Sequence, residues 1–189
     1  MVRRLPTTLD RARRGDRDAL AELWRTHHAP LLRYLRARRT PSPDDVASQV
    51  WVDIAKSIDR FEGEADDFRR WLFTIAHRRS VDEIRRVVRR SGLAVRAADH
   101  IAGHIAGADI EHDRHDALDR AIALVSTLPD NLAEAVMLRV VNDLPIADVA
   151  SVMGTTEGNV RVLVHRGLAR LRRKLCVTDE APQTMKSVP

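Results

Sequence analysis

The chain has 189 residues, with 32 Lys and Arg against 27 Asp and Glu, so its formal net charge is only +5. Hydrophobic residues make up 44% of the sequence, which excludes a disordered chain and allows one domain or two small ones. There is no long apolar stretch, no signal-peptide pattern and only one cysteine, Cys176, so we expect a cytoplasmic protein without membrane insertion or an intramolecular disulfide.

The first predicted elements are helices, because apolar residues recur at spacings of three and four. The first such run consists of Leu20, Leu23, Trp24, His27, Leu31, Tyr34 and Leu35. Pro30 interrupts this run, and we expect a kink or a break there. A second helix is predicted from Pro43 onward, with Ser42 as its N-cap, since proline suits the first helical position.

A third helix is predicted to start at Asp66 and Asp67, because carboxylates are stabilised at the positive end of a helix. Phe68, Trp71, Leu72 and Ile75 give it a buried face. Residues 91–114 then lose the aromatic residues and read as a flexible linker. No segment alternates with period two, so we expect no strand.

The most specific pattern follows the linker. Pro145 to Met153 predicts a short helix, Gly154 a turn, and Thr155 or Thr156 the cap of a longer basic helix. That helix is predicted to turn Val160, Leu163 or Val164, Leu168, Leu171 and Leu175 inward. A helix, a glycine turn and a basic helix form a helix-turn-helix, whose second helix fits the major groove of DNA. For this segment alone, an ordinary helical hairpin with a basic surface is the alternative.

Charge is unevenly distributed along the chain. Residues 69–90 carry a net charge of +6 and residues 157–175 carry +5, whereas residues 40–68 carry −6. Of the 29 arginines, 13 lie in the two basic blocks. One basic block is often only a solvated face, but two in a small protein favour a polyanionic partner, most often nucleic acid.

Several motifs in fixed order carry a resemblance to a known family. They are Asp44 to Trp51, Phe61-Glu62-Gly63, Phe68 to Arg86, Leu128-Pro129-Asp130, Leu144 to Ala150 and Glu157 to Arg172. With this order and spacing, residues 20–90 and 115–175 resemble the extracytoplasmic-function (ECF) group of sigma-70 RNA polymerase sigma factors. The resemblance implies an all-α fold of two small helical domains, a region 2 like domain (10–90) and a region 4 like helix-turn-helix domain (115–176), joined by the linker 91–114 and followed by a tail (177–189).

The resemblance also implies a function and its residues. Such a factor binds core RNA polymerase and directs it to promoters, with the −10 element read and opened by the first domain and the −35 element read by the second. The implied polymerase contacts are Asp45, Gln49, Trp51 and Asp53. The implied −10 contacts are Trp71, His77, Arg78, Arg79, Arg85 and Arg86, with a displaced base received by the loop at 62–67. The implied −35 contacts are Thr156, Glu157, Asn159, Arg161, His165 and Arg166.

An anti-sigma factor is a further partner that the resemblance implies. Trp71 has a second interpretation, because its spacing with Phe68 and Leu72 suits core packing better than stacking on a base. The sequence departs from the family at Ser48 in the polymerase-binding helix, at Arg78 in the melting helix, and at Asn159, Val162 and Leu163 in the recognition helix. From the last three we expect an unusual −35 preference.

Two other function classes stay open at this stage, a stand-alone helix-turn-helix regulator and a helical scaffold with a basic surface. We expect no enzyme, catalytic residue or cofactor, because the sequence has no phosphate-binding glycine loop and no nucleophile motif. We also expect no metal site, although His100, His104, His112 and His115 have suggestive spacings, because they lie in the linker region and the only thiol is Cys176.

Overall fold

The structure is a computed structural model that describes residues 7–91 and 112–179, with the side chains of 7–90 and 118–175. Within these ranges it is all-α, as the sequence predicted, and has no strand. The N-terminal half consists of α1 (Thr8–Arg13), α2 (Arg17–Ala37), α3 (Pro43–Ser57), a 3₁₀ turn η1 (Ile58–Arg60) and α4 (Ala65–Ser91). The C-terminal half consists of α5 (His112–Ser126), α6 (Asp130–Val136), a π-helical turn η2 (Met137–Val141), α7 (Ile146–Met153) and α8 (Glu157–Asp179).

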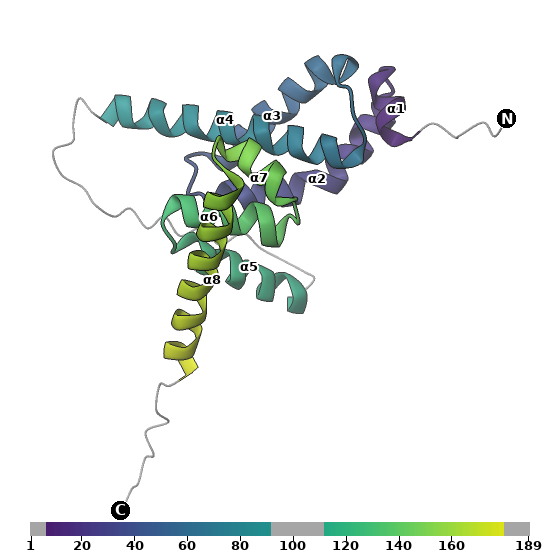
Figure 1. Cartoon of the computed structure of the whole chain (residues 1–189). Coiled ribbons are helices and arrows are strands. Elements are labelled where there is room, and N and C mark those ends of the chain that lie inside the picture. Colours follow the sequence, from purple (N-terminus) through teal and green to yellow (C-terminus); the bar gives the residue numbers. More distant parts are fainter. Residues whose placement is uncertain (1–6, 92–111, 180–189) are drawn as a thin grey trace, which may run out of the picture.

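The predicted linker and tail lie almost entirely outside the described residues, so their flexibility stays a prediction. Figure 1 shows α4 as the long helix along one edge of the molecule and α8 as the long helix that ends near the C-terminus.

The helices of the N-terminal half begin where local chemistry favours it. Asp16 caps α2, because its carboxylate accepts hydrogen bonds from the backbone N–H groups of Asp18 at 2.9 Å and Ala19 at 3.1 Å. Ser42 is at the N-cap of α3 and Pro43 is its first residue, as predicted, but the Ser42 side chain makes no capping bond.

A break at Pro30 is absent, since α2 continues through that residue. The physical reason is burial. Leu31, Tyr34 and Leu35, which follow the proline, are fully buried, and their packing outweighs the one hydrogen bond that proline removes.

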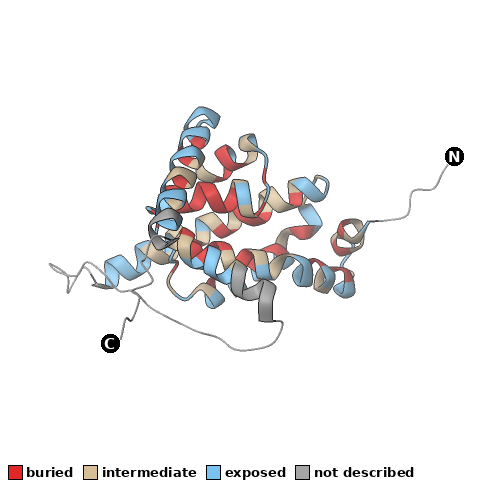
Figure 2. Ribbon diagram, turned by 90° about the horizontal axis from the view of Figure 1, so that it is seen from below, coloured by how far each residue is buried: buried red, intermediate tan, exposed pale blue. Residues whose placement is uncertain are grey.

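The core of the N-terminal half lies between α2, α3 and α4. Val50 and Ile54 of α3 and Leu72 of α4 are fully buried there. Figure 2 shows buried segments on the inward faces of the helices, with exposed segments on the outside. This packing fixes α3 and α4 against each other and so determines which of their side chains face solvent.

The C-terminal half is built around α6 and α8. Gly154 ends α7 with φ of +62°, the left-handed conformation that glycine adopts without strain. The next helix is capped by Thr156, whose Oγ1 accepts from the backbone N–H of Asn159 at 3.2 Å. This confirms the predicted helix, turn and second helix.

The two halves pack against each other. In Figure 1, α7 lies beside α4, while α5 and α6 lie beside α2, and contacts between these helix pairs agree with the view. The molecule is therefore closed, with one face of α4 turned toward the C-terminal half.

Candidate nucleic-acid and protein interfaces

The start of α8 presents all six residues predicted for DNA contact at the surface. Thr156, Glu157, Asn159, Arg161, His165 and Arg166 are exposed. Their arrangement is partly fixed, because Arg161 Nη2 lies 2.8 Å from Glu157 Oε2 and Asn159 Nδ2 donates to Thr155 Oγ1 at 2.9 Å. An exposed helix start with ordered donors and acceptors has the chemistry for reading base edges in a major groove.

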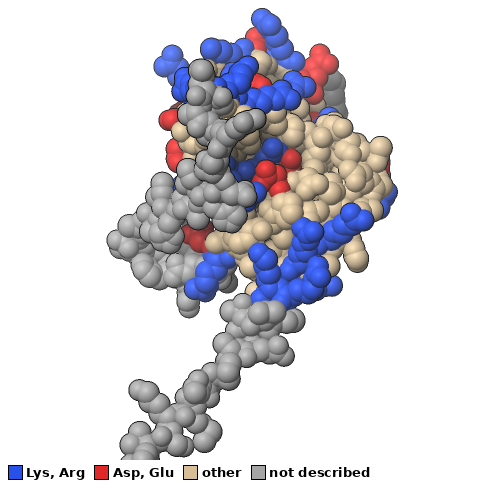
Figure 3. All heavy atoms as spheres, turned by 90° about the vertical axis from the view of Figure 1, so that its left-hand side faces the viewer, with Lys and Arg blue, Asp and Glu red and all other residues tan. Residues whose placement is uncertain are grey.

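The six residues predicted on α4 fall into two environments. Arg78, Arg85 and Arg86 are exposed, and Arg86 forms an ion pair with Glu83 at 2.7 Å. Figure 3 shows Lys and Arg side chains gathered in two places on one side of the molecule, above near the end of α4 and below on α8. These two basic surfaces correspond to the two basic blocks of the sequence.

The side chains of the other three contact other residues of the chain. Arg79 donates from Nε and Nη2 to the two carboxylate oxygens of Asp53, both at 2.6 Å, and this bond raises the pKa of Arg79. Trp71 is half-buried and stacks on Phe61, with ring centroids 4.7 Å apart and an angle of 22° between the planes. His77 lies against the C-terminal half, as described below.

The predicted polymerase contacts on α3 are likewise divided. Asp45 and Gln49 are exposed one turn apart, and Asp53 is half-buried in its pair with Arg79. Trp51 is only 8% exposed and packs in the core, so its side chain is not available at the surface of this conformation. Its indole N–H has no hydrogen-bond partner within the described ranges.

Sequence reasoning missed two exposed apolar side chains. Val52 on α3 is 41% exposed, three residues after Gln49. Trp24 on α2 is 45% exposed and stacks on His28 with centroids 4.5 Å apart, although the sequence placed it in the buried run. Leu23, His27 and Leu31 recur every four residues and define the inward face of α2. Trp24 lies one residue beyond Leu23 and therefore falls beside that face, which is the signal that could have identified it as exposed.

A buried polar cluster joins the two halves. Glu134 of α6 accepts from Tyr34 Oη at 2.6 Å, forms an ion pair with Arg38, and lies 2.7 Å from His77 Nδ1. Arg38 Nη1 also donates to Tyr34 Oη at 3.0 Å. We call these four residues the interdomain cluster.

The interdomain cluster keeps a carboxylate charged in a buried place. Burial by itself opposes the charged form of Glu134, but the hydrogen bond with His77 and the charge of Arg38 outweigh it and hold the pKa of Glu134 below its usual value. Burial and the charge of Glu134 raise the pKa of Tyr34 well above its usual value, so the phenol stays a donor.

Further contacts cover the same face of α4. Arg70 Nη1 lies 3.2 Å from Asp148 Oδ1 on α7, and Arg69 donates to the backbone carbonyl of Asn142. Arg39, just after α2, forms an ion pair with Asp130 at the start of α6. The closed arrangement thus occupies Arg69, Arg70 and His77 with partners inside the chain.

The described helices include none that is both long and apolar enough to cross a membrane. Residues 7–90 and 118–175 bring no three His, Cys, Asp or Glu side chains together in a way that could hold a metal ion. The histidines at 100, 104, 112 and 115 and Cys176 lie outside the described side chains.

Comparison with known proteins gives matches to both halves. The family model for sigma-70 region 2 matches residues 23–90, and that for sigma-70 region 4 matches residues 118–171. The ECF RNA polymerase sigma factor SigD of Mycobacterium tuberculosis is 30% identical over 183 residues, covering 94% of this chain and 86% of SigD. The ECF RNA polymerase sigma factor ShbA of Streptomyces griseus is 30% identical over 178 residues, covering 86% of this chain and 90% of ShbA.

A solved structure shares the fold. It is CnrH in complex with the cytosolic domain of CnrY, which superposes with a TM-score of 0.61 at 20% identity and covers 90% of this chain and 96% of that one.

Proposed function

Because this chain belongs to the ECF RNA polymerase sigma factors of the sigma-70 family, it is a transcription initiation factor, and we propose how its residues divide the work at a promoter. It binds core RNA polymerase and directs it to promoters with −10 and −35 elements. In our proposal the domain at 10–90 binds polymerase and opens the −10 element, and the domain at 115–176 reads the −35 element. The polymerase core carries out the chemistry in the cytoplasm, and we assign no catalytic residue to this chain.

The observation that carries this division is the presence of two exposed basic helices, one in each half. In the C-terminal half, Asn159 and Arg161 at the start of α8 face solvent and are fixed by Thr155 and Glu157, so they can meet base edges with little loss of side-chain freedom. His165 and Arg166, one turn later, are exposed and can reach phosphates.

Transcription from a reconstituted holoenzyme tests this assignment. Arg161→Ala should weaken promoter binding by about 1–3 kcal/mol through a lost base contact, and Arg166→Ala should weaken it through a lost phosphate contact. Arg120→Ala on α5 is the control, because Arg120 is also an exposed arginine but lies outside α8. If both α8 variants bound the promoter as tightly as the control, α8 would not be the recognition helix.

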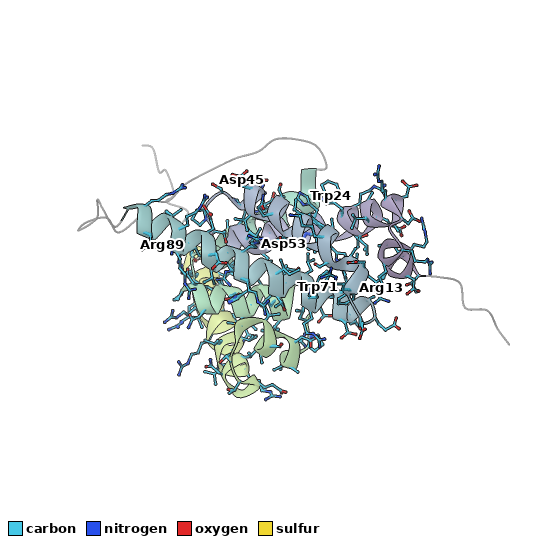
Figure 4. The ribbon with its side chains drawn as sticks, turned by 90° about the horizontal axis from the view of Figure 1, so that it is seen from above. Arg13, Trp24, Asp45, Asp53, Trp71 and Arg89 are labelled. Atoms are coloured by element: carbon cyan, nitrogen blue, oxygen red, sulfur yellow. The ribbon has the colours of Figure 1, made fainter. Side chains whose placement is uncertain are left out.

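In the N-terminal half, the exposed row of Asp45, Gln49 and Val52 on α3 is the surface that we assign to polymerase. An apolar side chain beside an acidic and an amide group suits a basic partner surface with an apolar centre. Figure 4 shows Asp45 and Asp53, which both come from α3. We assign Asp53 the role of orienting Arg79, and Trp51 that of supporting α3 from the core.

On α4, the exposed Arg78, Arg85 and Arg86 are suited to follow the backbone of a separated strand. Trp71, stacked on Phe61, forms the base of the loop at 62–67, which we assign to a displaced −10 base. Fork-shaped DNA with a single-stranded −10 segment tests this, because holoenzyme should lose affinity when one base of that segment is removed.

The closed arrangement is an inactive state in our proposal, because His77, Arg69 and Arg70 are occupied within the chain. Binding of core polymerase would separate the halves, and an anti-sigma factor would hold the DNA surfaces covered. Calorimetric titration with the cytosolic segment of a genomically neighbouring membrane protein tests the partner. A complex that fails to reduce promoter binding would contradict its role as an inhibitor.

A further inference from the structure

The short helix α1 lies before the segment that matches region 2, yet it is firmly attached to that domain. Leu9 and Ala12 are buried against the rest of the N-terminal half. Thr7 and Asp10 form a capping box, with Thr7 N to Asp10 Oδ2 at 2.9 Å and Asp10 N to Thr7 Oγ1 at 3.1 Å. The other oxygen of the same carboxylate, Asp10 Oδ1, lies 3.3 Å from Arg13 Nη1. One carboxylate therefore both starts the helix and orients Arg13.

Arg13 contacts the loop between η1 and α4 in two ways. Its Nη2 donates to the backbone carbonyl of Gly63. Its guanidinium lies over the ring of Phe61, 5.3 Å from the ring centroid, where a cation is attracted by the π system. Figure 4 shows Arg13 and Trp71 at the same end of the molecule, with Trp71 stacked on the other partner of Arg13, Phe61.

The loop is held from α4 as well. Glu64 N donates to Asp67 Oδ2 at 3.0 Å, and a Cβ atom at Gly63 would lie 2.6 Å from Asp67 Cβ. Gly63 has φ of +143°, a conformation that other residues rarely adopt. A cavity of about 220 Å³ beside the loop is lined by Thr8 of α1, Glu64 and Phe68. The loop is thus clamped between Asp67 on one side and Arg13 on the other.

We propose that Arg13 is a positioning residue for promoter opening, and that α1 braces the loop from Phe61 to Glu64 in the shape that receives a displaced base. This rests on the proposed function of the loop at 62–67. A loop with a left-handed glycine has several accessible shapes when free, so fixing one of them before DNA arrives lowers the entropic cost of capture. Arg13 donates a hydrogen bond to the Gly63 carbonyl, while Glu62 and Glu64 of the same loop stay exposed.

The test compares Arg13→Ala holoenzyme with Arg14→Ala holoenzyme. Arg14 is the next residue and is exposed, so its replacement removes the same charge without touching the loop. Loss of one charge-assisted hydrogen bond predicts about tenfold slower open-complex formation for Arg13→Ala, with an unchanged affinity for closed promoter duplex. Arg13→Lys keeps the charge but loses the planar contact with Phe61, so its rate should lie between the two.

A scan of single abasic sites along the −10 strand of fork DNA distinguishes positioning of the loop by Arg13 from a purely structural role of Arg13. Wild-type and Arg14→Ala holoenzymes should lose affinity at the position whose base the loop receives. Arg13→Ala should show little loss at that position, because its loop no longer holds the base. Thermal unfolding of each variant reports whether the fold is kept, and Arg13→Lys gives a second comparison if Arg13→Ala unfolds.

The possible results separate the two proposals. If the wild type shows an abasic effect and Arg13→Ala shows the same effect at the same position, Arg13 does not act through the loop and the inference is wrong. If the wild type shows no abasic effect at any position, the loop does not capture a base, and the proposed function of the loop falls together with the inference.

Discussion

The pair of Asp53 and Arg79 connects the helix that we assign to polymerase with the helix that we assign to DNA. Resemblance alone gives these two residues separate partners outside the chain, whereas the structure joins them by two hydrogen bonds of 2.6 Å. A bidentate pair fixes the guanidinium plane, so Arg79 can serve DNA only in the orientation that Asp53 allows. The effect of either residue on transcription therefore depends on the other.

A double-mutant cycle of Asp53→Asn and Arg79→Gln measures this dependence. Both side chains are partly exposed, 27% and 42%, so we expect a coupling free energy of only about 0.5–1 kcal/mol in thermal unfolding. In promoter opening, the double variant should be no worse than Arg79→Gln alone, because Asp53 then has nothing left to orient. Additive losses in opening would instead show that Asp53 has a partner of its own.

At the scale of elements, the close contact of α6 and α8 depends on a glycine. A Cβ atom at Gly167 would lie 2.6 Å from Val136 Cγ2, and Val136 is 2% exposed, so it has no room to move aside. α8 is the second helix of the helix-turn-helix, and α6 packs against it. The size of the side chain at position 167 therefore controls how closely the recognition helix α8 packs on α6.

Gly167→Ala is expected to destabilise the protein although alanine favours helix. Overpacking typically costs about 1–3 kcal/mol, against about 1 kcal/mol gained in helix propensity, so the net loss should reach about 1–2 kcal/mol. Gly158→Ala is the matched control, because it lies in the same helix with nothing within 4 Å of the added Cβ, and should stabilise by about 0.5–1 kcal/mol. Equal effects of the two changes on chemical unfolding would contradict the packing argument.

The helices themselves were predictable because their signals are local. Apolar spacing placed α3, α4 and α7 where the structure has them, and Gly154 marked the turn. The errors arise where tertiary contacts decide. Pro30 does not break α2, because buried residues on its C-terminal side hold the helix. Leu175 is 57% exposed although the α8 stripe predicted it inward, since α8 extends beyond the helices that cover it.

The site was predictable in residue type and less so in environment. The six α8 residues are all exposed, which agrees with their proposed role. The resemblance gives Trp51, Asp53 and Asp45 the same role, but Trp51 is buried and Asp53 is paired with Arg79. A sequence match identifies the position of a contact residue, whereas its burial depends on residues from other helices.

At the scale of the whole molecule, a linker between two domains is compatible with their closing on one another, but the residues that meet in the closed arrangement could not be predicted from the sequence. Glu134 lies in an apolar stretch of α6 between Ala133 and Ala135, and its partners Tyr34 and Arg38 come from the other half of the chain. No local pattern signals such a pairing. A buried carboxylate without partners would be costly. Because the partners of Glu134 come from the other half, the stability of the closed arrangement depends on this residue.

The charge of Glu134 predicts how closure depends on pH. Its pKa is lowered in the folded protein, so its contribution is fully present above the ordinary carboxyl value of 4.5 and is lost as pH falls through the lowered pKa. Closure should therefore be constant from about pH 8 to about pH 5 and should weaken in more acidic solution. Small-angle scattering over this range measures it, and opening already at pH 6 would contradict the assignment to Glu134.

Glu134→Gln tests the closed state directly. Glutamine keeps the shape and can still accept from Tyr34, but it leaves Arg38 buried without its counter-charge, which typically costs about 3–5 kcal/mol. The molecule can escape this cost by opening, because Arg38 then reaches water. We expect a larger radius of gyration, faster hydrogen exchange along the covered face of α4, and tighter binding of the free factor to −10 fork DNA. Asp130→Asn is the control, since its pair with Arg39 is exposed, 63% and 58%, and should contribute at most about 1 kcal/mol. If Glu134→Gln stayed as compact as Asp130→Asn and bound DNA no better, closure would not be what limits the free factor.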